Sequence, residues 1–242
     1  MEGKVGSFQF LIVGAGRSGT SLLAGLLDQH SSIEVGFEYG ASEYLRGKGL
    51  ADDPANILEQ RAGGFRDACQ REAKKSNCLM WGNKITTEQL GGLNKHNYYN
   101  APKLDVYSLF FNQYMSGIRV IYLLRDGRAC IQSKMKRTGQ PMEQAVAHWK
   151  RAVQVYDLLQ ERNQTLFVRF ESLLADPRAS LSQILGFLGQ PYQEQTMEGT
   201  MHPKMLPQYR RPGFDAERGT SFDAGHACVP YIRDELTRTG YL

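Results

Sequence analysis

The stretch Phe8-Gln-Phe-Leu-Ile-Val13, followed by Gly14-Ala-Gly-Arg-Ser-Gly-Thr-Ser21, decides the fold class of this chain. Its first part is a continuous apolar run that ends in glycine, which is typical of a buried parallel strand. After Gly19 the spacing of four leucines predicts a helix with one apolar face: Leu22, Leu23, Leu26 and Leu27. A strand, a glycine-rich loop and a helix in this order present free backbone N–H groups to an anion.

The rest of the chain alternates between apolar strand-like runs and helical patterns. This alternation predicts an α/β fold, a P-loop-type parallel sheet with helices on both faces. Strands are expected at 8–13, 33–37, 78–81, 119–124 and 165–170. Helices are expected from 19 to about 30 and at 104–115, 126–136, 142–161, 177–188 and 232–239. We expect 41–76 to be partly helical, 91–103 to be a loop, and 190–228 to be mostly irregular. Since no repeat or low-complexity tract interrupts it, residues 1–242 are expected to form a single domain.

The glycine loop departs from the phosphate loop of ordinary kinases and GTPases. That motif reads G-x-x-x-x-G-K-[ST], whereas here Gly14 and Gly19 have the right spacing and Thr20 stands at the lysine position. The cation is Arg17, inside the loop. This disfavours a P-loop nucleotide or small-molecule kinase, which stays as an alternative. A loop serving only tight packing would not need the polar side chains of Arg17, Thr20 and Ser21.

The surplus positive charge is concentrated in one window. The chain has 29 basic and 25 acidic residues, a formal net charge of +4. Between Arg125 and Arg137 there are five basic residues and one acid, an excess as large as that of the whole chain. A local excess of this kind indicates an anion site. A non-catalytic nucleic-acid-binding domain remains a further alternative. Three of the five basic residues of this window fit a solvated helix face instead of an anion site: Arg128, Lys134 and Lys136.

Three expected strands end directly in polar residues, at Gly14–Ser21, Gly82–Lys84 and Arg125. Ligands of parallel sheets bind outside the carboxyl ends of the strands, so we expect these residues to form one site. The guanidinium of Arg125 can bind a phosphate through two parallel hydrogen bonds. Ser133 follows two helical turns later, and Arg137 lies on the same helix face as Ser133.

Two motifs resemble those of sulfotransferases that use 3′-phosphoadenosine 5′-phosphosulfate (PAPS). Arg17-Ser-Gly-Thr-Ser-Leu-Leu23 resembles the loop that binds the 5′-phosphosulfate, and Leu124-Arg-Asp-Gly-Arg-Ala-Cys-Ile-Gln-Ser133 resembles the 3′-phosphate motif. The resemblance implies a sulfotransferase fold, PAPS as cofactor, adenosine 3′,5′-bisphosphate as product and no dependence on a metal. The cofactor-binding residues that it implies are Gly16, Arg17, Ser18, Gly19, Thr20, Ser21, Arg125, Ser133 and Arg137.

Within this superfamily the chain is most similar to the tyrosylprotein sulfotransferases. Four further segments resemble that branch, at 147–152, 168–173, 184–189 and 239–241. Glu38 matches the catalytic glutamate of the branch, and Lys84 in Gly-Asn-Lys matches its sulfuryl-contacting lysine. The resemblance therefore implies that Glu38 is the catalytic base and that Arg17 and Lys84 stabilise developing charge.

The chain departs from that branch around the acceptor. The branch has basic residues just after its glutamate, which recognise acidic peptides, whereas here the first base is Arg46. Phe170 stands where a tyrosine is common, which removes one hydroxyl contact to the cofactor. We therefore expect a small-molecule or natural-product acceptor with a hydroxyl or amine group, and a peptide tyrosine is the alternative. No nucleic-acid partner is expected.

The remaining features suggest an ordinary cytoplasmic protein. The four cysteines lack zinc-site spacing and are expected to be free, buried thiols. The chain shows no signal peptide and no apolar run of membrane-spanning length. Trp81 and Trp149 are expected in the core, and His148 as a packing or solvated residue. The segment 190–228, which includes Tyr209, is a candidate lid over the site, with an unordered excursion as the rival interpretation.

Overall fold

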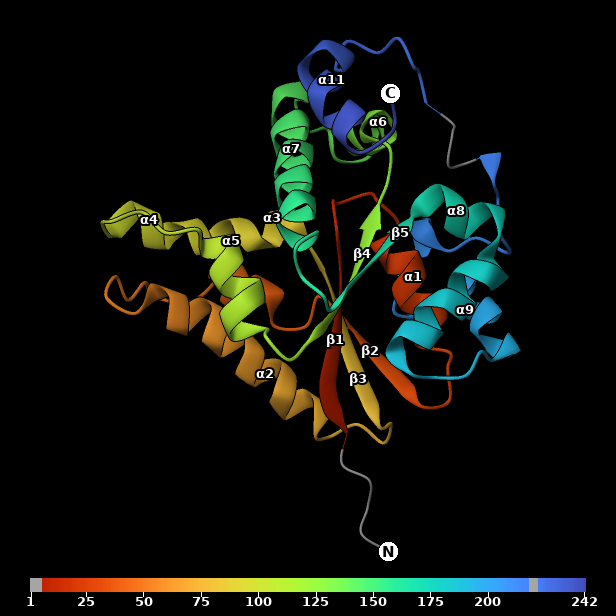
Figure 1. Cartoon of the computed structure of the whole chain (residues 1–242), viewed down its shortest axis with the longest axis horizontal. Coiled ribbons are helices and arrows are strands. Elements are labelled where there is room, and N and C mark those ends of the chain that lie inside the picture. The colour runs from red at the N-terminus through yellow and green to blue at the C-terminus, as the bar shows by residue number, and fades with distance from the viewer. Residues whose placement is uncertain (1–5, 218–221) are drawn as a thin grey trace, which may run out of the picture.

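Five parallel strands form the centre of the computed structural model, which describes residues 6–217 and 222–242 (Figure 1). They are β1 (Ser7–Gly14), β2 (Ile33–Phe37), β3 (Met80–Thr86), β4 (Arg119–Leu124) and β5 (Thr165–Arg169). Their order in the sheet is β2-β3-β1-β4-β5, and every neighbouring pair is parallel. The predicted parallel sheet is confirmed, and β1 with its glycine loop occupies the middle of it.

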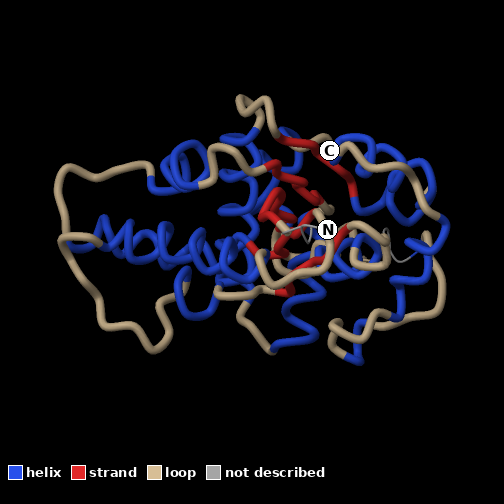
Figure 2. The backbone as a smooth tube through the Cα atoms, turned by 90° about the horizontal axis from the view of Figure 1, so that it is seen from below, coloured by secondary structure: helices blue, strands red, loops and turns tan. Residues whose placement is uncertain are grey.

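Helices cover both faces of the sheet, as predicted. Successive residues of β1 point to opposite faces, so Leu11 and Val13 pack into one core cluster and Phe10 and Ile12 into another. The first face carries α2 (Gly64–Ala73), α5 (Val106–Leu109) and the last turns of α7 (Met142–Leu159). The second carries α1 (Thr20–Leu27), α8 (Phe170–Ala175) and α9 (Pro177–Leu188). Figure 2 shows the strands in the middle with helices on both sides.

A third cluster lies beyond the carboxyl ends of the strands. It joins α6 (Gly127–Thr138), the first turns of α7 and α11 (Val229–Arg238), which lie together at the top of Figure 1. Trp149 packs here and Trp81 packs under the sheet, with 2% and 1% of their surfaces exposed. Both tryptophans are therefore core residues, as predicted. This cluster supports the strand end at which the basic window begins.

The predicted helices 126–136, 142–161, 177–188 and 232–239 correspond to α6, α7, α9 and α11. The helix predicted from Gly19 is α1, and the one predicted at 104–115 is α5 followed by a π-helical turn, Phe110–Tyr114. The partly helical segment 41–76 contains the π-helical turns Ala41–Leu45 and Glu59–Gly63 before α2. Two short 3-10 helices, Glu194–Met201 and Pro207–Tyr209, lie within the segment predicted as mostly irregular.

Two predictions were wrong in detail. The strand predicted at 78–81 begins at Met80 and continues to Thr86, so Lys84 lies inside β3 rather than beyond its end. The strand continues through Gly82. A glycine is needed there because a side chain would overlap the ring of Phe10 on β1. The loop predicted at 91–103 contains a 3-10 helix, Gly91–Asn94, and α4 (Lys95–Tyr99). That helix has no buried face and therefore no apolar periodicity to reveal it.

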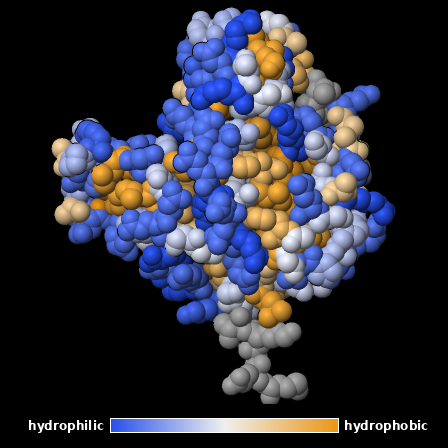
Figure 3. Space-filling view, viewed as in Figure 1, coloured by the Kyte–Doolittle hydropathy of each residue, from blue (hydrophilic) through white to orange (hydrophobic). Residues whose placement is uncertain are grey.

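The cysteines are free thiols, and the surface is largely hydrophilic on the face shown in Figure 3. Cys69, Cys130 and Cys228 are buried and Cys78 is half-buried, all as free thiols. In the described part of the chain, no helix combines the length and the hydropathy that a membrane span requires. The face shown in Figure 3 is largely hydrophilic, with apolar residues gathered over its middle and at the tip of the arm that carries α4.

Candidate active site

A cleft of about 790 Å³ opens where β1, β2 and β3 end. Its walls come from the glycine loop, the residues after β2, the end of β3, the connection between α6 and α7, and the segment around Tyr209. The lining includes every residue that the resemblance marks as catalytic: Arg17, Glu38 and Lys84. The structure thus brings together residues that are far apart in the sequence, as the strand ends indicated. Within residues 6–217 and 222–242, no group of three or more potential metal ligands is formed.

The carboxylate of Glu38 is held at both of its oxygens. Lys84 Nζ lies 2.6 Å from Oε1, and Gln89 Nε2 donates to Oε2 at 2.7 Å. The Lys84 side chain is 5% exposed, whereas the Glu38 side chain is 40% exposed and faces the cleft. The backbone N–H of Glu38 donates to the carbonyl of Lys84 at 2.8 Å. The Glu38 carboxylate is therefore fixed in orientation while it remains exposed to a ligand in the cleft.

Two of these cleft residues have a strained backbone. Arg17 has φ of 79° and Glu38 has φ of 63°, and they are the only non-glycine residues with positive φ among residues 6–217 and 222–242. A side chain in this region clashes with its own backbone, at a cost of about 1–2 kcal/mol per residue. Strain of this kind persists where the surrounding structure imposes it, and it concentrates at functional sites.

This strain gives a stability prediction at Arg17. The Arg17→Gly variant is expected to be about 1 kcal/mol more stable than Arg17→Ala, because both lose the guanidinium and only alanine keeps the clash. Urea unfolding of the two variants measures the difference. The same pair at Lys136, an exposed position within α6, should show the usual opposite order. An Arg17→Ala variant as stable as Arg17→Gly would contradict the prediction.

One amide of the glycine loop, that of Gly16, already has a hydrogen-bond partner. Gly16 N donates to both carboxylate oxygens of Glu88, at 3.0 and 2.9 Å, and the same carboxylate accepts a hydrogen bond from Lys134. Burial would raise the pKa of Glu88, but the charge and the hydrogen bond of Lys134 outweigh it and hold this pKa below its usual range. Of the loop residues implied to bind the cofactor, Gly16 therefore has its N–H committed to another partner.

The rest of the loop retains donors. Thr20 and Ser21 begin α1, whose first amides have no acceptor within the helix. Ser18 is fully buried, and its hydroxyl has no hydrogen-bond partner in the part of the chain that the structure describes. A buried hydroxyl without a partner is costly. Thr20 and Ser21 line the cleft and are available to an anion at the start of α1, whereas the Ser18 hydroxyl is enclosed.

The expectation of a solvated basic face was wrong for two members of the window. Lys134 is 8% exposed and paired with Glu88, and Arg128 forms an ion pair of 2.6 Å with Asp126. Lys134 is matched by an acid 46 positions away, and Arg128 is matched by Asp126, two positions before it at the start of α6. Lys136 is exposed, as expected.

The basic residues at the end of β4 meet the glycine loop. Arg125 Nη1 donates to the carbonyl of Arg17 at 2.9 Å, and Arg17 Nε donates to Ser133 Oγ at 3.2 Å. Burial lowers the pKa of the Arg17 guanidinium, Tyr209 opposes this effect, and the charges of Arg137 and Arg125 lower it further. Three guanidinium groups are thus held within electrostatic reach of one another, which favours an anion between them.

Phe170 fixes the position of Arg125 against the loop. The Arg125 guanidinium lies over its ring, with Cζ 4.5 Å from the ring centre. Gly19 has φ of 96°, and a side chain there would overlap the same ring. Arg17, Arg125, Phe170 and Tyr209 line a second, small pocket of about 60 Å³. This pocket adjoins the wide cleft, since Arg17, Thr20 and Tyr209 line both.

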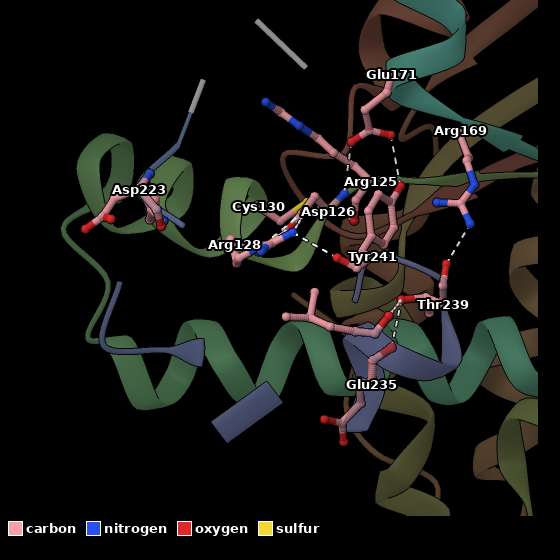
Figure 4. A network of polar contacts seen from close by, with 12 residues as sticks. Arg125, Asp126, Arg128, Cys130, Arg169, Glu171, Asp223, Glu235, Thr239 and Tyr241 are labelled. Atoms are coloured by element: carbon pink, nitrogen blue, oxygen red, sulfur yellow. Dashed lines mark hydrogen bonds and ion pairs between the residues drawn. The ribbon is translucent and has the colours of Figure 1, made fainter. Parts of the chain in front are cut away.

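The carboxyl-terminal residues support this strand end (Figure 4). Glu171 accepts hydrogen bonds from Asp126 N at 3.1 Å and from the Tyr241 hydroxyl at 2.9 Å. Arg128 Nη2 donates to the carbonyl of Tyr241 at 3.0 Å, and Arg169 donates to the carbonyl of Thr239. These contacts clamp the turn that follows Arg125 between α8 and the end of the described chain.

Sequence reasoning misjudged His148 and missed Gln89, whereas Tyr209 belongs to the predicted lid segment. His148 lines it, with Nδ1 3.1 Å from Gln140 Nε2 and 3.5 Å from Lys134 Nζ. Burial, followed by the charge of Lys134, lowers the pKa of His148, so the ring is neutral near pH 7. Gln89 contacts Glu38 although nothing in its local sequence marked it. Tyr209 stacks on Arg17, with the guanidinium carbon 4.4 Å from the ring centre.

The candidate lid segment thus reaches the site through Tyr209. Met205 and Leu206 from the same segment also line the cleft. Arg210 points elsewhere, since its guanidinium donates to the carbonyls of Met205 and Pro203. Of the candidate segment 190–228, residues 218–221 lie outside the described residues.

Comparison with known proteins adds a family match. The model of a family described as "Sulfotransferase family" matches residues 9–194. The sulfotransferase domain of the Synechococcus PCC 7002 olefin synthase is similar in structure, with 17% identity, a TM-score of 0.66, and 100% of this chain and 97% of that chain covered. The sulfotransferase domain of the curacin biosynthetic pathway has 16% identity and a TM-score of 0.61, with 98% of each chain covered.

A third similar structure is mouse sulfotransferase SULT7A1 complexed with PAP. It has 13% identity and a TM-score of 0.53, with 96% of this chain and 84% of that chain covered. At these identities the likeness shows a shared fold. No curated protein sequence matches the chain.

Proposed function

Because this chain belongs to the sulfotransferase family, and is therefore an enzyme, we propose that it transfers a sulfuryl group from PAPS to a hydroxyl or amine of a small acceptor. One observation carries the proposal. A carboxylate held by a buried lysine faces the same cleft as a strained arginine in an anion-binding loop. This arrangement places a proton acceptor beside fixed positive charge, which is what transfer of an anionic group requires.

The residues around the loop fit a donor with two separate anionic groups. At the start of α1, Thr20 and Ser21 line the cleft and supply hydroxyl and backbone donors. Next to the loop, Ser133 accepts a hydrogen bond from Arg17 Nε, Arg125 donates to the carbonyl of Arg17, and the charge of Arg137 acts on the Arg17 guanidinium. We assign the first group to the 5′-phosphosulfate and the second to the 3′-phosphate. When bound, PAPS supplies the activated sulfuryl group, and adenosine 3′,5′-bisphosphate is released.

The chain's own side chains would perform the remaining tasks. Glu38 takes the proton from the acceptor's O–H or N–H group as that atom attacks sulfur. Each carboxylate oxygen has two lone pairs, so one stays available after the bonds to Lys84 and Gln89 are made. Arg17 and Lys84 stabilise the negative charge that develops on the sulfuryl and bridging oxygens. Because both cations are held in place before reaction, they need little reorganisation.

The cleft supports a small acceptor. Its volume of about 790 Å³ is within the range of small-molecule sites, about 300–1,000 Å³. Part of its lining consists of uncharged polar groups from the end of α6, the α6–α7 connection and α7: Thr138, Gln140, Gln144 and His148. Hydrogen-bonding groups on a concave wall suit the orientation of a compact polar molecule. A peptide tyrosine remains the alternative acceptor.

Binding and turnover test the proposal directly. Adenosine 3′,5′-bisphosphate is expected to bind without Mg²⁺, and Mg-ATP is expected not to compete with it, because fixed cations take the place of the metal. Calorimetry measures both. Labelled PAPS with a panel of small hydroxyl and amine acceptors then identifies turnover.

The alternatives predict other results. Binding of Mg-ATP with no affinity for the bisphosphate would indicate a nucleotide or small-molecule kinase. Binding of nucleic acid with a steep salt dependence, and no preference for the bisphosphate, would indicate a nucleic-acid-binding domain.

A further inference from the structure

We propose that Gln89 is a positioning residue, which holds the carboxylate of Glu38 in the orientation that accepts the acceptor's proton. The inference rests on the proposed function, since it assigns a partner to the proposed base. Gln89 belongs to α3 (Thr87–Leu90), the short helix that follows β3, and it is 2% exposed. Its contact with Glu38 joins residues 51 positions apart.

The orientation of the Gln89 amide is fixed by its second partner. Thr86 N lies 2.8 Å from Gln89 Oε1, and a backbone N–H can only donate, so the oxygen must be the atom at Thr86. The Nε2 group is then the atom that faces Glu38 Oε2 at 2.7 Å, and it donates. The amide cannot turn over without placing two donors together at Thr86. Gln89 therefore always presents a donor to the carboxylate.

A second donor is needed because Glu38 is otherwise free to move. Its side chain is 40% exposed, and Lys84 holds only Oε1. One contact leaves the carboxylate free to rotate about that oxygen, whereas a donor on each oxygen fixes its plane. A proton acceptor misplaced by about 1 Å loses roughly 100-fold in rate. The bond from Gln89 is thus expected to affect the reaction step rather than ligand binding.

The same short helix also holds the loop. Glu88, the neighbour of Gln89, accepts the N–H of Gly16 through both of its oxygens. Consecutive residues of α3 therefore contact the donor-binding loop and the proposed base. The helix α3 therefore sets the position of the glycine loop relative to Glu38, and Gln89 is the residue of this helix that contacts Glu38.

One substitution separates positioning from helix capping. Gln89→Met keeps the approximate volume and loses both hydrogen bonds of the amide. If Gln89 positions Glu38, this variant lowers kcat by about 10- to 100-fold, with unchanged KM for the acceptor and unchanged affinity for adenosine 3′,5′-bisphosphate. Gln113→Met, at an exposed position on another element, is the matched control and should retain the parent kcat.

The two proposals fail in distinguishable ways. If Gln89 only caps α3, Gln89→Met loses thermal stability and keeps the parent kcat, and this result overturns the positioning role. A rise in KM with unchanged kcat would also overturn it. A double variant with Glu38→Gln should add no further loss to Glu38→Gln alone, and a full additional loss would contradict the inference. Failure of the proposed function would instead appear in the parent protein, as an absence of sulfuryl transfer.

Discussion

The Glu38→Gln variant is expected to lose about 10²- to 10⁴-fold in kcat, because an amide cannot accept the proton that general-base catalysis removes. Its size is nearly that of the carboxylate, but its amide NH₂ must face either Lys84 or Gln89, so one of these two hydrogen bonds is lost as well. Affinity for adenosine 3′,5′-bisphosphate is expected to stay close to that of the parent, since Glu38 lines the cleft and not the small pocket beside Arg125. Turnover of labelled PAPS with an active acceptor, together with calorimetry of the bisphosphate, measures the two quantities.

A nearby glutamate provides the control for this variant. Glu43 lies five positions later, in the π-helical turn Ala41–Leu45, and is exposed. Glu43→Gln makes the same chemical change without touching Lys84 or Gln89, and it should leave kcat unchanged. Full turnover in Glu38→Gln would show that another group takes the proton. In that case the neutral ring of His148, which lines the same cleft, is the next residue to test.

The Arg125→Ala variant is expected to weaken binding of adenosine 3′,5′-bisphosphate by about 2–4 kcal/mol, or roughly 30- to 1,000-fold. Arg125 is 8% exposed, so a phosphate that it binds is largely removed from water and loses a charged partner on truncation. Arg125→Lys should recover only part of the loss, because an ammonium group cannot form two parallel hydrogen bonds. Calorimetry of both variants measures the effect.

The choice of ligand isolates the 3′-phosphate. Adenosine 5′-phosphate lacks that group, so Arg125→Ala and the parent should bind it with similar affinity. Lys136→Ala is the matched control within the same basic window, since Lys136 is exposed on α6. It should change affinity slightly and in a salt-dependent way. An unchanged affinity of Arg125→Ala for the bisphosphate would remove the 3′-phosphate assignment.

The features predicted correctly from the sequence depend on local patterns. The apolar run before Gly14, the leucine spacing of α1 and the strand before Arg125 each determine their own structure over a few residues. Their convergence followed from a general property of parallel sheets, whose carboxyl ends lie at one edge. For this reason Arg17, Lys84 and Arg125 were expected in one place, and the family resemblance added Glu38. The structure places Arg17, Glu38 and Lys84 in one cleft.

The features that were missed depend on partners distant in the sequence. Lys134 looked like a surface lysine because its partner, Glu88, lies 46 positions away. Gln89 lies on α3 and His148 on α7, and no local periodicity shows that these two helix residues reach the site. Similarly, α4 was taken for a loop because its stabilising contacts come from elsewhere, such as the ion pair of Lys95 with Asp52 at 2.7 Å.

The clamp around Tyr241 has a consequence for how the protein is made. Arg128, at the start of α6, donates to the carbonyl of Tyr241, 113 positions later. Glu171 accepts a hydrogen bond from the hydroxyl of the same Tyr241. On a translating ribosome, the central strand β1 and its loop emerge long before these partners exist. Domains generally fold as units during synthesis. The phosphate side of the site can therefore be completed only when residues 239–241 have left the exit tunnel.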